Sequence, residues 1–191
     1  MPDFWNDWFT PNIPFLSRVL SGIAHVPGLE ALEIGCFDGR SSCWFMDHIL
    51  DGSGSCITCI DHFLGGKDHN GLIDMTTTES RFRSNISPYG DRVRLLKGLS
   101  SEVLTSAVIG PCDFIYVDGS HESADVLEDA VLSWPMLKHG GIMIFDDYQW
   151  GLERPPDQRP GIGIDSFLSA YRGKLTIIDK GYQMAVRKTE P

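Results

Sequence analysis

The chain has no apolar stretch that approaches the roughly 20 residues needed to cross a membrane as a helix. Its first residues, Met1-Pro2-Asp3-Phe4-Trp5-Asn6-Asp7-Trp8, contain no basic segment ahead of an apolar one, as a secretory signal would. Positive charge is scarce, because 16 Lys and Arg stand against 26 Asp and Glu, a net charge of -10. We therefore expect a cytoplasmic protein that binds neither nucleic acid nor membrane.

Cysteine pairs suited to a zinc site are also missing. The chain has five cysteines, at Cys36, Cys43, Cys56, Cys59 and Cys112. Cys56 and Cys59 have the C-x-x-C spacing of metal and redox sites. However, they lie in a predicted strand, where residues three apart point to opposite faces, and no second pair accompanies them. We expect buried free thiols, because cysteine packs as a small apolar residue.

The 191 residues fit one domain, residues 1–191, in which residues 1–27 form an aromatic and helical N-terminal extension. After this extension, apolar runs alternate with segments of helical periodicity. The predicted strands are Ala31–Ile34, Ser55–Ile60, Arg92–Leu96, Cys112–Val117 and Gly141–Phe145. The predicted helices are Phe15–Leu20, Gly39–Leu50, Thr77–Ser87, Ser100–Val108 and Ser123–Leu137. This alternation predicts βαβ units and a parallel sheet.

The pattern changes near the C-terminus. A loop rich in Pro and Gly, residues 150–163, precedes a predicted helix over Ile164–Arg172. Two β-rich runs follow, Leu175–Ile178 and Tyr182–Val186. Only residues 179–181 separate them, and a connection that short joins antiparallel strands. We predict an α/β, Rossmann-like doubly wound sheet of seven strands, five parallel and then a C-terminal antiparallel hairpin.

Acidic residues follow two of the predicted strands. Asp118 ends one apolar run, and His121 stands three residues later; Asp146 and Asp147 end another. Open α/β sheets bind ligands outside the carboxyl ends of their strands. The three acids are therefore expected at one rim, where they suit a hard divalent cation such as Mg²⁺. The alternatives are a solvated turn for Asp146 and Asp147 and a helix N-terminus for the segment around His121.

A glycine turn follows the first predicted strand. Gly35 and Gly39 let the backbone turn tightly and approach a ligand. Their spacing, G-x-x-x-G, is not the dinucleotide fingerprint G-x-G-x-x-G. Asp61, after the second strand, stands where nucleotide-binding folds often place a ribose-binding acid. Glu33 lies inside the first strand, so it either serves a ligand or hydrogen-bonds the turn behind it.

The stretches Leu32–Ser41 and Phe114–His121, with the acid after strand two and the terminal hairpin, resemble the class I S-adenosylmethionine-dependent methyltransferases. The branch they are most similar to is the methyltransferase-24 family, akin to macrolide-sugar and catechol-type O-methyltransferases. The resemblance implies that Glu33, Gly35 and Gly39 cradle the methionine part of the cofactor and that Asp61 holds the ribose. It places the Gly98–Ser100 turn beside the adenine. The further cofactor-site residues it implies are Cys36, Phe37, Ser41, His62, Ser100 and Asp118.

The same resemblance implies that Asp118, Asp146 and Asp147 are metal ligands and that His121 is the general base, with Asp118 beside it in the catalytic site. Imidazole titrates near neutrality, which suits that role. Weaker candidates for the acceptor side are His62 or His69. Residues that could cover the acceptor are Trp5, Trp8, Phe9, Trp150, Arg154 and Arg159.

The sequence thus predicts metal-assisted transfer of a methyl group from S-adenosylmethionine to a hydroxyl of a small molecule. Two other functions stay open at this point. One is a nicotinamide-dinucleotide oxidoreductase. The missing third glycine of the dinucleotide fingerprint and the antiparallel tail argue against it. The other is a methyltransferase-like binding module without catalysis. The aromatic N-terminus also suggests a homo-oligomer.

Overall fold

The structure is a computed structural model that describes residues 2–66 and 74–189. Its seven-stranded sheet has the order β3-β2-β1-β4-β5-β7-β6. The strands are β1 (Glu30–Ile34), β2 (Cys56–Asp61), β3 (Val93–Lys97), β4 (Cys112–Val117), β5 (Leu137–Phe145), β6 (Leu175–Lys180) and β7 (Met184–Lys188). The first five pair in parallel, and β7 is antiparallel to both β5 and β6. The predicted fold is confirmed.

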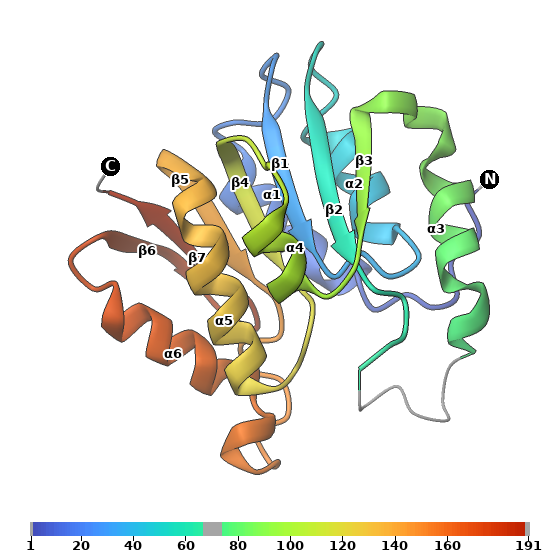
Figure 1. The fold of residues 1–191 in the computed structure, drawn as a ribbon. Helices are drawn as coiled ribbons and strands as arrows, with labels where there is room; N and C mark the ends of the chain where they lie inside the picture. Colours follow the sequence, from blue (N-terminus) through green and yellow to red (C-terminus); the bar gives the residue numbers. More distant parts are fainter. Residues whose placement is uncertain (1, 67–73, 190–191) are drawn as a thin grey trace.

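Helices cover both faces of this sheet (Figure 1). In Figure 1, α4, α5 and α6 lie in front of the strands, and α1 and α2 lie behind them. The α-helices are α1 (Ile13–Leu20), α2 (Arg40–His48), α3 (Thr78–Ile86), α4 (Ser100–Ser106), α5 (Ser123–Ser133) and α6 (Pro160–Ala170). Short 3₁₀ segments are η1 (Thr10–Asn12), η3 (Met75–Thr77), η4 (Ser87–Arg92), η5 (Trp134–Met136) and η6 (Pro156–Gln158).

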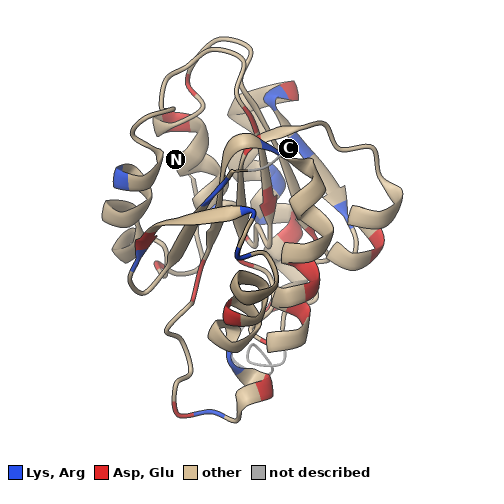
Figure 2. Cartoon of the chain, turned by 90° about the vertical axis from the view of Figure 1, so that its left-hand side faces the viewer, with Lys and Arg blue, Asp and Glu red and all other residues tan. Residues whose placement is uncertain are grey.

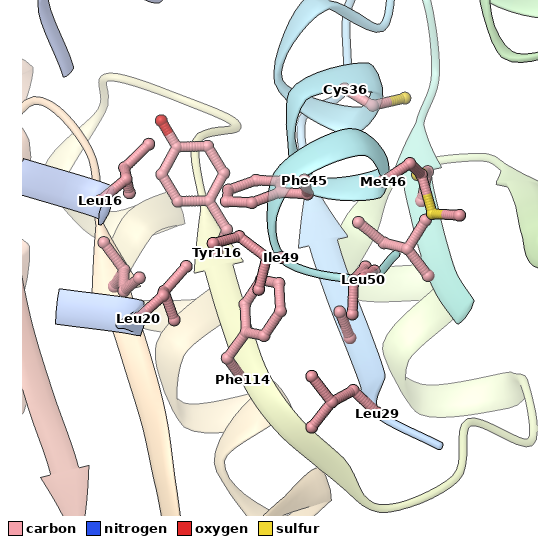
Figure 3. Close-up of a cluster of buried hydrophobic side chains, with 14 of the residues drawn as sticks. Leu16, Leu20, Leu29, Cys36, Phe45, Met46, Ile49, Leu50, Phe114 and Tyr116 are labelled. Atoms are coloured by element: carbon pink, nitrogen blue, oxygen red, sulfur yellow. The ribbon is translucent and has the colours of Figure 1, made fainter. Parts of the chain in front are cut away.

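The strands alternate their side chains between two cores. On β4, Phe114 and Tyr116 pack toward α1 and α2, whereas Ile115 and Val117 pack toward α5 and α6. Figure 3 shows the first core, in which the Phe45 ring lies beside those of Phe114 and Tyr116. This core includes fully buried α1 side chains, so the predicted N-terminal extension packs on the sheet. Burial on both faces fixes the register of each strand, since a one-residue slip would exchange the faces.

Prolines shift several predicted boundaries. The helix predicted over Ser123–Leu137 ends at Ser133, because Pro135 has no N–H to continue it, and η5 follows. Strand β5 then begins at Leu137 rather than Gly141. Helix α6 begins at Pro160 rather than Ile164, since proline suits the first helical turn. Residues 160–163, the last four of the predicted loop over residues 150–163, are therefore helical.

The charged residues are distributed over many elements (Figure 2), and the cysteines are present as thiols. Figure 2 shows acidic residues, in red, spread over helices and loops with basic residues between them. No helix among the described residues is long and apolar enough to cross a membrane. All five cysteines are free thiols; Cys56 is partly exposed and the other four are buried.

Gly163 provides a test of the packing between α5 and α6. A Cβ atom at this position would lie 2.1 Å from the backbone oxygen of Ser123. Gly163→Ala should therefore destabilise the protein by about 1–3 kcal/mol or more, because backbone atoms must move apart. Chemical denaturation measures this loss. Gly173→Ala is the control, since nothing lies within 4 Å of its Cβ position; equal stability of the two variants would contradict the packing argument.

Candidate active site

A cleft of about 1200 Å³ opens at the carboxyl ends of the parallel strands. Its centre is the switch point of the sheet, where β1 lies between β2 and β4. Gly35, after β1, has φ +85°, and a Cβ atom there would lie 2.0 Å from the backbone oxygen of Asp118. Only glycine fits, so the turns after β1 and β4 meet backbone to backbone. Both line the cleft.

Glu33 secures the glycine turn from behind. Its carboxylate is fully buried and accepts hydrogen bonds from the hydroxyls of Ser41 and Ser42 and from the thiol of Cys59, 3.4 Å away. Burial raises the pKa of Glu33 to about 7, although these donors act against the rise. Because Ser41 and Ser42 belong to α2, Glu33 ties β1 to the first turn of the next helix.

Asp61 fixes the backbone of the turn after β1 and of the loop that follows β2. Its Oδ2 accepts the backbone N–H groups of Cys36 and Phe37, at 3.0 and 2.8 Å, and its Oδ1 accepts that of Phe63 at 2.7 Å. A carboxylate offers about four lone pairs, so one acceptor position remains on Oδ1. Asp61 lines the cleft, with His62 next to it.

The three rim acids form one cluster. Asp118, Asp146 and Asp147 each offer a carboxylate oxygen, and these oxygens all lie within 4.8 Å of one another. Burial and the neighbouring carboxylates raise the pKa of Asp118 well above its usual range, and burial and Asp147 raise that of Asp146 to about 7. The site therefore concentrates negative charge that a cation would stabilise.

Neutral donors, which the sequence did not reveal, hold Asp146 in place. The Asn12 side chain donates to both carboxylate oxygens, at 3.0 and 3.1 Å, and Gln183 donates to Oδ1 at 2.6 Å. The Tyr116 hydroxyl is within hydrogen-bonding reach of both Asp118 and Asp146. Asn12 and Gln183 come from opposite ends of the chain, so sequence spacing gives no signal for them.

His121 is adjacent to the cluster. Its Nε2 lies 2.7 Å from Oδ2 of Asp147, and its ring is 4.2 Å from that of Trp150, centroid to centroid. Tyr182 donates its hydroxyl to Oδ1 of Asp147. Asp147 has φ +56°, a strained conformation for a residue with a side chain. Such strain persists where the surroundings fix a side chain in a functional position.

The N-terminal segment supplies an aromatic wall of the cleft. Trp5 and Trp8 are 5.6 Å apart by ring centroids, and Trp8 is 5.9 Å from Phe37. The segment is fixed in place, because the Trp5 N–H donates to Asp38 at 2.7 Å and Asp7 pairs with Arg40 at 2.9 Å. Across the cleft, Arg154 lies over the Trp150 ring at 4.3 Å. Flat aromatic rings therefore line the same cleft as the acid cluster.

Most of the predicted site residues meet in this cleft. Those that line it are Gly35, Cys36, Phe37, Ser41, Asp61, His62, Ser100, Asp118, His121, Asp146 and Asp147. Glu33 and Gly39 do not; Glu33 lies behind the turn, and Gly39 caps α2 with φ +87°. Of the predicted covering residues, Trp5, Trp8, Phe9, Trp150 and Arg154 line the cleft, whereas Arg159 does not. His69 lies outside the described residues.

A methyltransferase domain family, the methyltransferase-24 family, matches residues 32–148, which contain both the glycine turn and the acid cluster. The chain belongs to this family. Its membership confirms the resemblance to class I methyltransferases. A search of curated proteins found no match.

Solved methyltransferase structures share the fold. The O-methyltransferase NovP is 21% identical, with a TM-score of 0.68 over 94% of this chain and 79% of its own. An O-methyltransferase from Bacillus cereus in complex with SAH is 20% identical, with a TM-score of 0.66 over 92% and 81%. TomG from Streptomyces achromogenes, in complex with SAM, is 18% identical, with a TM-score of 0.65 over 92% and 77%.

The raised pKa of Glu33 predicts a pH dependence of stability. Below about pH 4.5 the group is protonated in both states. Between about pH 4.5 and 7 only the folded state keeps the proton, so rising pH lowers the free energy of unfolding by up to roughly 3 kcal/mol. Glu33→Gln should lack this part of the pH dependence. Urea unfolding of both proteins at pH 5 and 7.5 measures the difference, and parallel pH profiles would contradict it.

Proposed function

We propose that this protein transfers a methyl group from S-adenosylmethionine to a hydroxyl oxygen of a small molecule, with a divalent cation at the acid cluster. The observation that carries the proposal is the meeting of two features in one cleft. The glycine turn after β1 and the cluster of Asp118, Asp146 and Asp147 line the same cavity. The first suits the donor, and the second suits an acceptor hydroxyl.

The donor side fits a nucleoside carrying an amino acid. Gly35 brings the turn after β1 into backbone contact with the turn after β4, and Ser41 and Asp61 line the same cleft. Asp61 is held as an acceptor of three N–H groups, which orients its remaining lone pair for a ribose hydroxyl. NovP, the Bacillus cereus enzyme and TomG are named O-methyltransferases, and two were solved with SAH or SAM, which supports this assignment.

The acceptor side fits a hard cation. The donor set is three carboxylates, the oxygen ligands that Mg²⁺ and Mn²⁺ prefer. Such an ion, when bound, lowers the pKa of an acceptor hydroxyl and orients it. Asn12 and Gln183 keep Asp146 turned toward the cluster. Because these donors are neutral, they do not cancel the negative charge that would attract the cation.

His121 is the proposed general base. It lines the cleft beside the cluster, and its contact with Asp147 would stabilise the positive charge that the ring gains with a proton. A tilted contact with the Trp150 ring restricts the orientation of the imidazole. The aromatic wall of Trp5 and Trp8 would exclude water from the reacting hydroxyl.

The two other functions are less well supported. The G-x-x-x-G spacing of Gly35 and Gly39 is not the dinucleotide fingerprint, and dinucleotide oxidoreduction does not require the acid cluster. A binding module without catalysis does not require three carboxylates close together. Calorimetry with SAH and with NAD separates these possibilities, and binding of NAD alone would refute the proposed function.

Substitutions of Asp146 and of Asp61 should weaken the binding of different ligands. Asp146→Ala should lower Mn²⁺ affinity at least about tenfold, because it removes one of three ligands, while SAH affinity changes only a few-fold. Asp61→Ala should weaken SAH at least about tenfold and leave Mn²⁺ binding nearly unchanged. Titration calorimetry measures both. Asp91→Ala, at an exposed position in η4, is the control.

If Asp146→Ala abolished SAH binding and left Mn²⁺ binding intact, the assignment of the two sides of the cleft would be wrong. Asp146→Asn keeps an acceptor oxygen for Asn12 and Gln183, so it tests the same point with less disturbance of the fold.

Loss of the general base should slow methyl transfer and leave the binding of the methyl donor nearly unchanged. His121→Ala should lower the rate of methyl transfer about 10²–10⁴-fold, the usual contribution of a general base. SAH affinity should stay within a few-fold. The measurement uses labelled S-adenosylmethionine with phenolic and sugar acceptors. Trp150→Ala is the control for the lost ring contact; a near-wild-type rate for His121→Ala at neutral pH would exclude the base role.

A further inference from the structure

Arg154 is a positively charged residue in a cleft that is otherwise rich in acids. It lines the cleft from the loop between β5 and α6, and its side chain is partly buried. Its guanidinium carbon lies 4.3 Å from the centroid of the Trp150 ring. Within residues 2–66 and 74–189, the Arg154 side chain forms no ion pair and donates no hydrogen bond. Its charge is therefore available to a ligand.

The other arginine of the cleft is already engaged. Among the described residues that line the cleft, the Lys and Arg side chains are Arg40 and Arg154. Arg40 lies 2.9 Å from a carboxylate oxygen of Asp7, and it donates to the Thr10 hydroxyl at 2.9 Å. A guanidinium that rests on a ring by its flat face, as Arg154 does, keeps the N–H donors in its plane for another partner.

Two consecutive turns hold Arg154 close to the proposed reacting groups. The Trp150 N–H donates to the carbonyl oxygen of Asp147 at 2.9 Å. The Arg154 N–H then donates to the carbonyl oxygen of Gly151 at 2.8 Å. The Trp150 ring also lies 4.2 Å from the ring of His121, which contacts Asp147. One aromatic ring therefore contacts both the guanidinium and the proposed general base.

This arrangement limits the size of an acceptor that uses both groups. The guanidinium carbon and the imidazole centroid each lie within 4.3 Å of the Trp150 centroid, so one small molecule can reach both. A benzene ring that carries a hydroxyl and a short acidic substituent has a suitable span. Aromatic rings also suit the tryptophans of the cleft, since Trp5 and Trp8 are 41% and 53% exposed and offer flat faces.

We propose that Arg154 binds a carboxylate of the acceptor, so that the substrate is a hydroxylated aromatic acid. This inference rests on the proposed function, because it assumes that the acceptor hydroxyl lies beside His121. A guanidinium pairs with a carboxylate through two parallel N–H···O bonds. The single charge of a carboxylate matches one arginine, whereas a phosphate group would bring nearly two negative charges into a cleft lined by acids.

Two other roles of Arg154 make different predictions. If its side chain only supports the Trp150 ring, its removal weakens the binding of all acceptors alike. If the acids of the cleft decide which acceptors bind, an amine binds more tightly than an acid. A carboxylate-binding Arg154 predicts the opposite order, with the acid first, the neutral amide second and the amine last. The relative affinities of three such compounds therefore distinguish the roles.

The probes are 3,4-dihydroxybenzoate, 3,4-dihydroxybenzamide and 3,4-dihydroxybenzylamine, which differ in the charge of one substituent. Titration calorimetry measures the affinity of each compound for the protein in the presence of SAH and Mg²⁺. The wild-type protein should bind the acid at least about tenfold more tightly than the amide, because hydrogen bonds between charged groups are strong. In Arg154→Met this ratio should fall at least about tenfold, while methionine keeps an apolar contact with Trp150. Arg172→Met, which removes an exposed arginine outside the cleft, is the matched control and should keep the wild-type ratio.

A titration with SAH alone separates this inference from the proposed function. If the wild-type protein does not bind SAH, the proposed function fails. If it binds SAH but none of the three compounds, or binds the acid no better than the amide, the role of Arg154 is overturned while the proposed function stands. An unchanged ratio in Arg154→Met has the same consequence. Should Arg154→Met not fold, the wild-type protein decides alone, because it should bind the amine more weakly than the amide and the reverse order would refute the proposal.

Discussion

The contact between two backbone turns, at Gly35 and Asp118, is the constraint on which the site depends. No side chain fits between them, and the strand ends are joined by hydrogen bonds from Asp118 N to Ile34 O and from Gly35 N to Ile60 O, both 2.8 Å. These bonds place the ends of β1, β2 and β4 side by side. The cleft exists because the helices that follow these strands leave on opposite faces of the sheet (Figure 1).

Neutral donors hold the buried acids in the cleft and behind it. Serine hydroxyls donate to Glu33 behind the turn, and side-chain amides donate to Asp146 in the cleft. A lysine or arginine in these positions would lower the cost of burying the carboxylates, but it would also cancel their charge. Burial raises the pKa values of Glu33 and Asp146, and the hydrogen bonds from neutral partners offset only part of the rise.

The sequence predicted the strand ends well, because a parallel sheet brings them to one rim whatever the details of packing. Asp61, Asp118, Asp146 and Asp147 each follow an apolar run, so their shared location follows from the order of elements. Helix and strand limits were less accurate where proline intervened, as at Pro135. Residues that reach the site across the fold, such as Asn12 and Gln183, could not be predicted, because local spacing does not encode which segments pack together.

The sequence by itself determined the fold class, the rim of the sheet and the kinds of chemical group gathered there. Those features depend on hydrophobic periodicity and on turn residues, which are local. Only the tertiary structure decided that Glu33 lies behind the turn rather than lining the cleft, and that Asp129 faces into it from the middle of a helix. A buried carboxyl group takes its role from the donors around it, and those donors come from other elements.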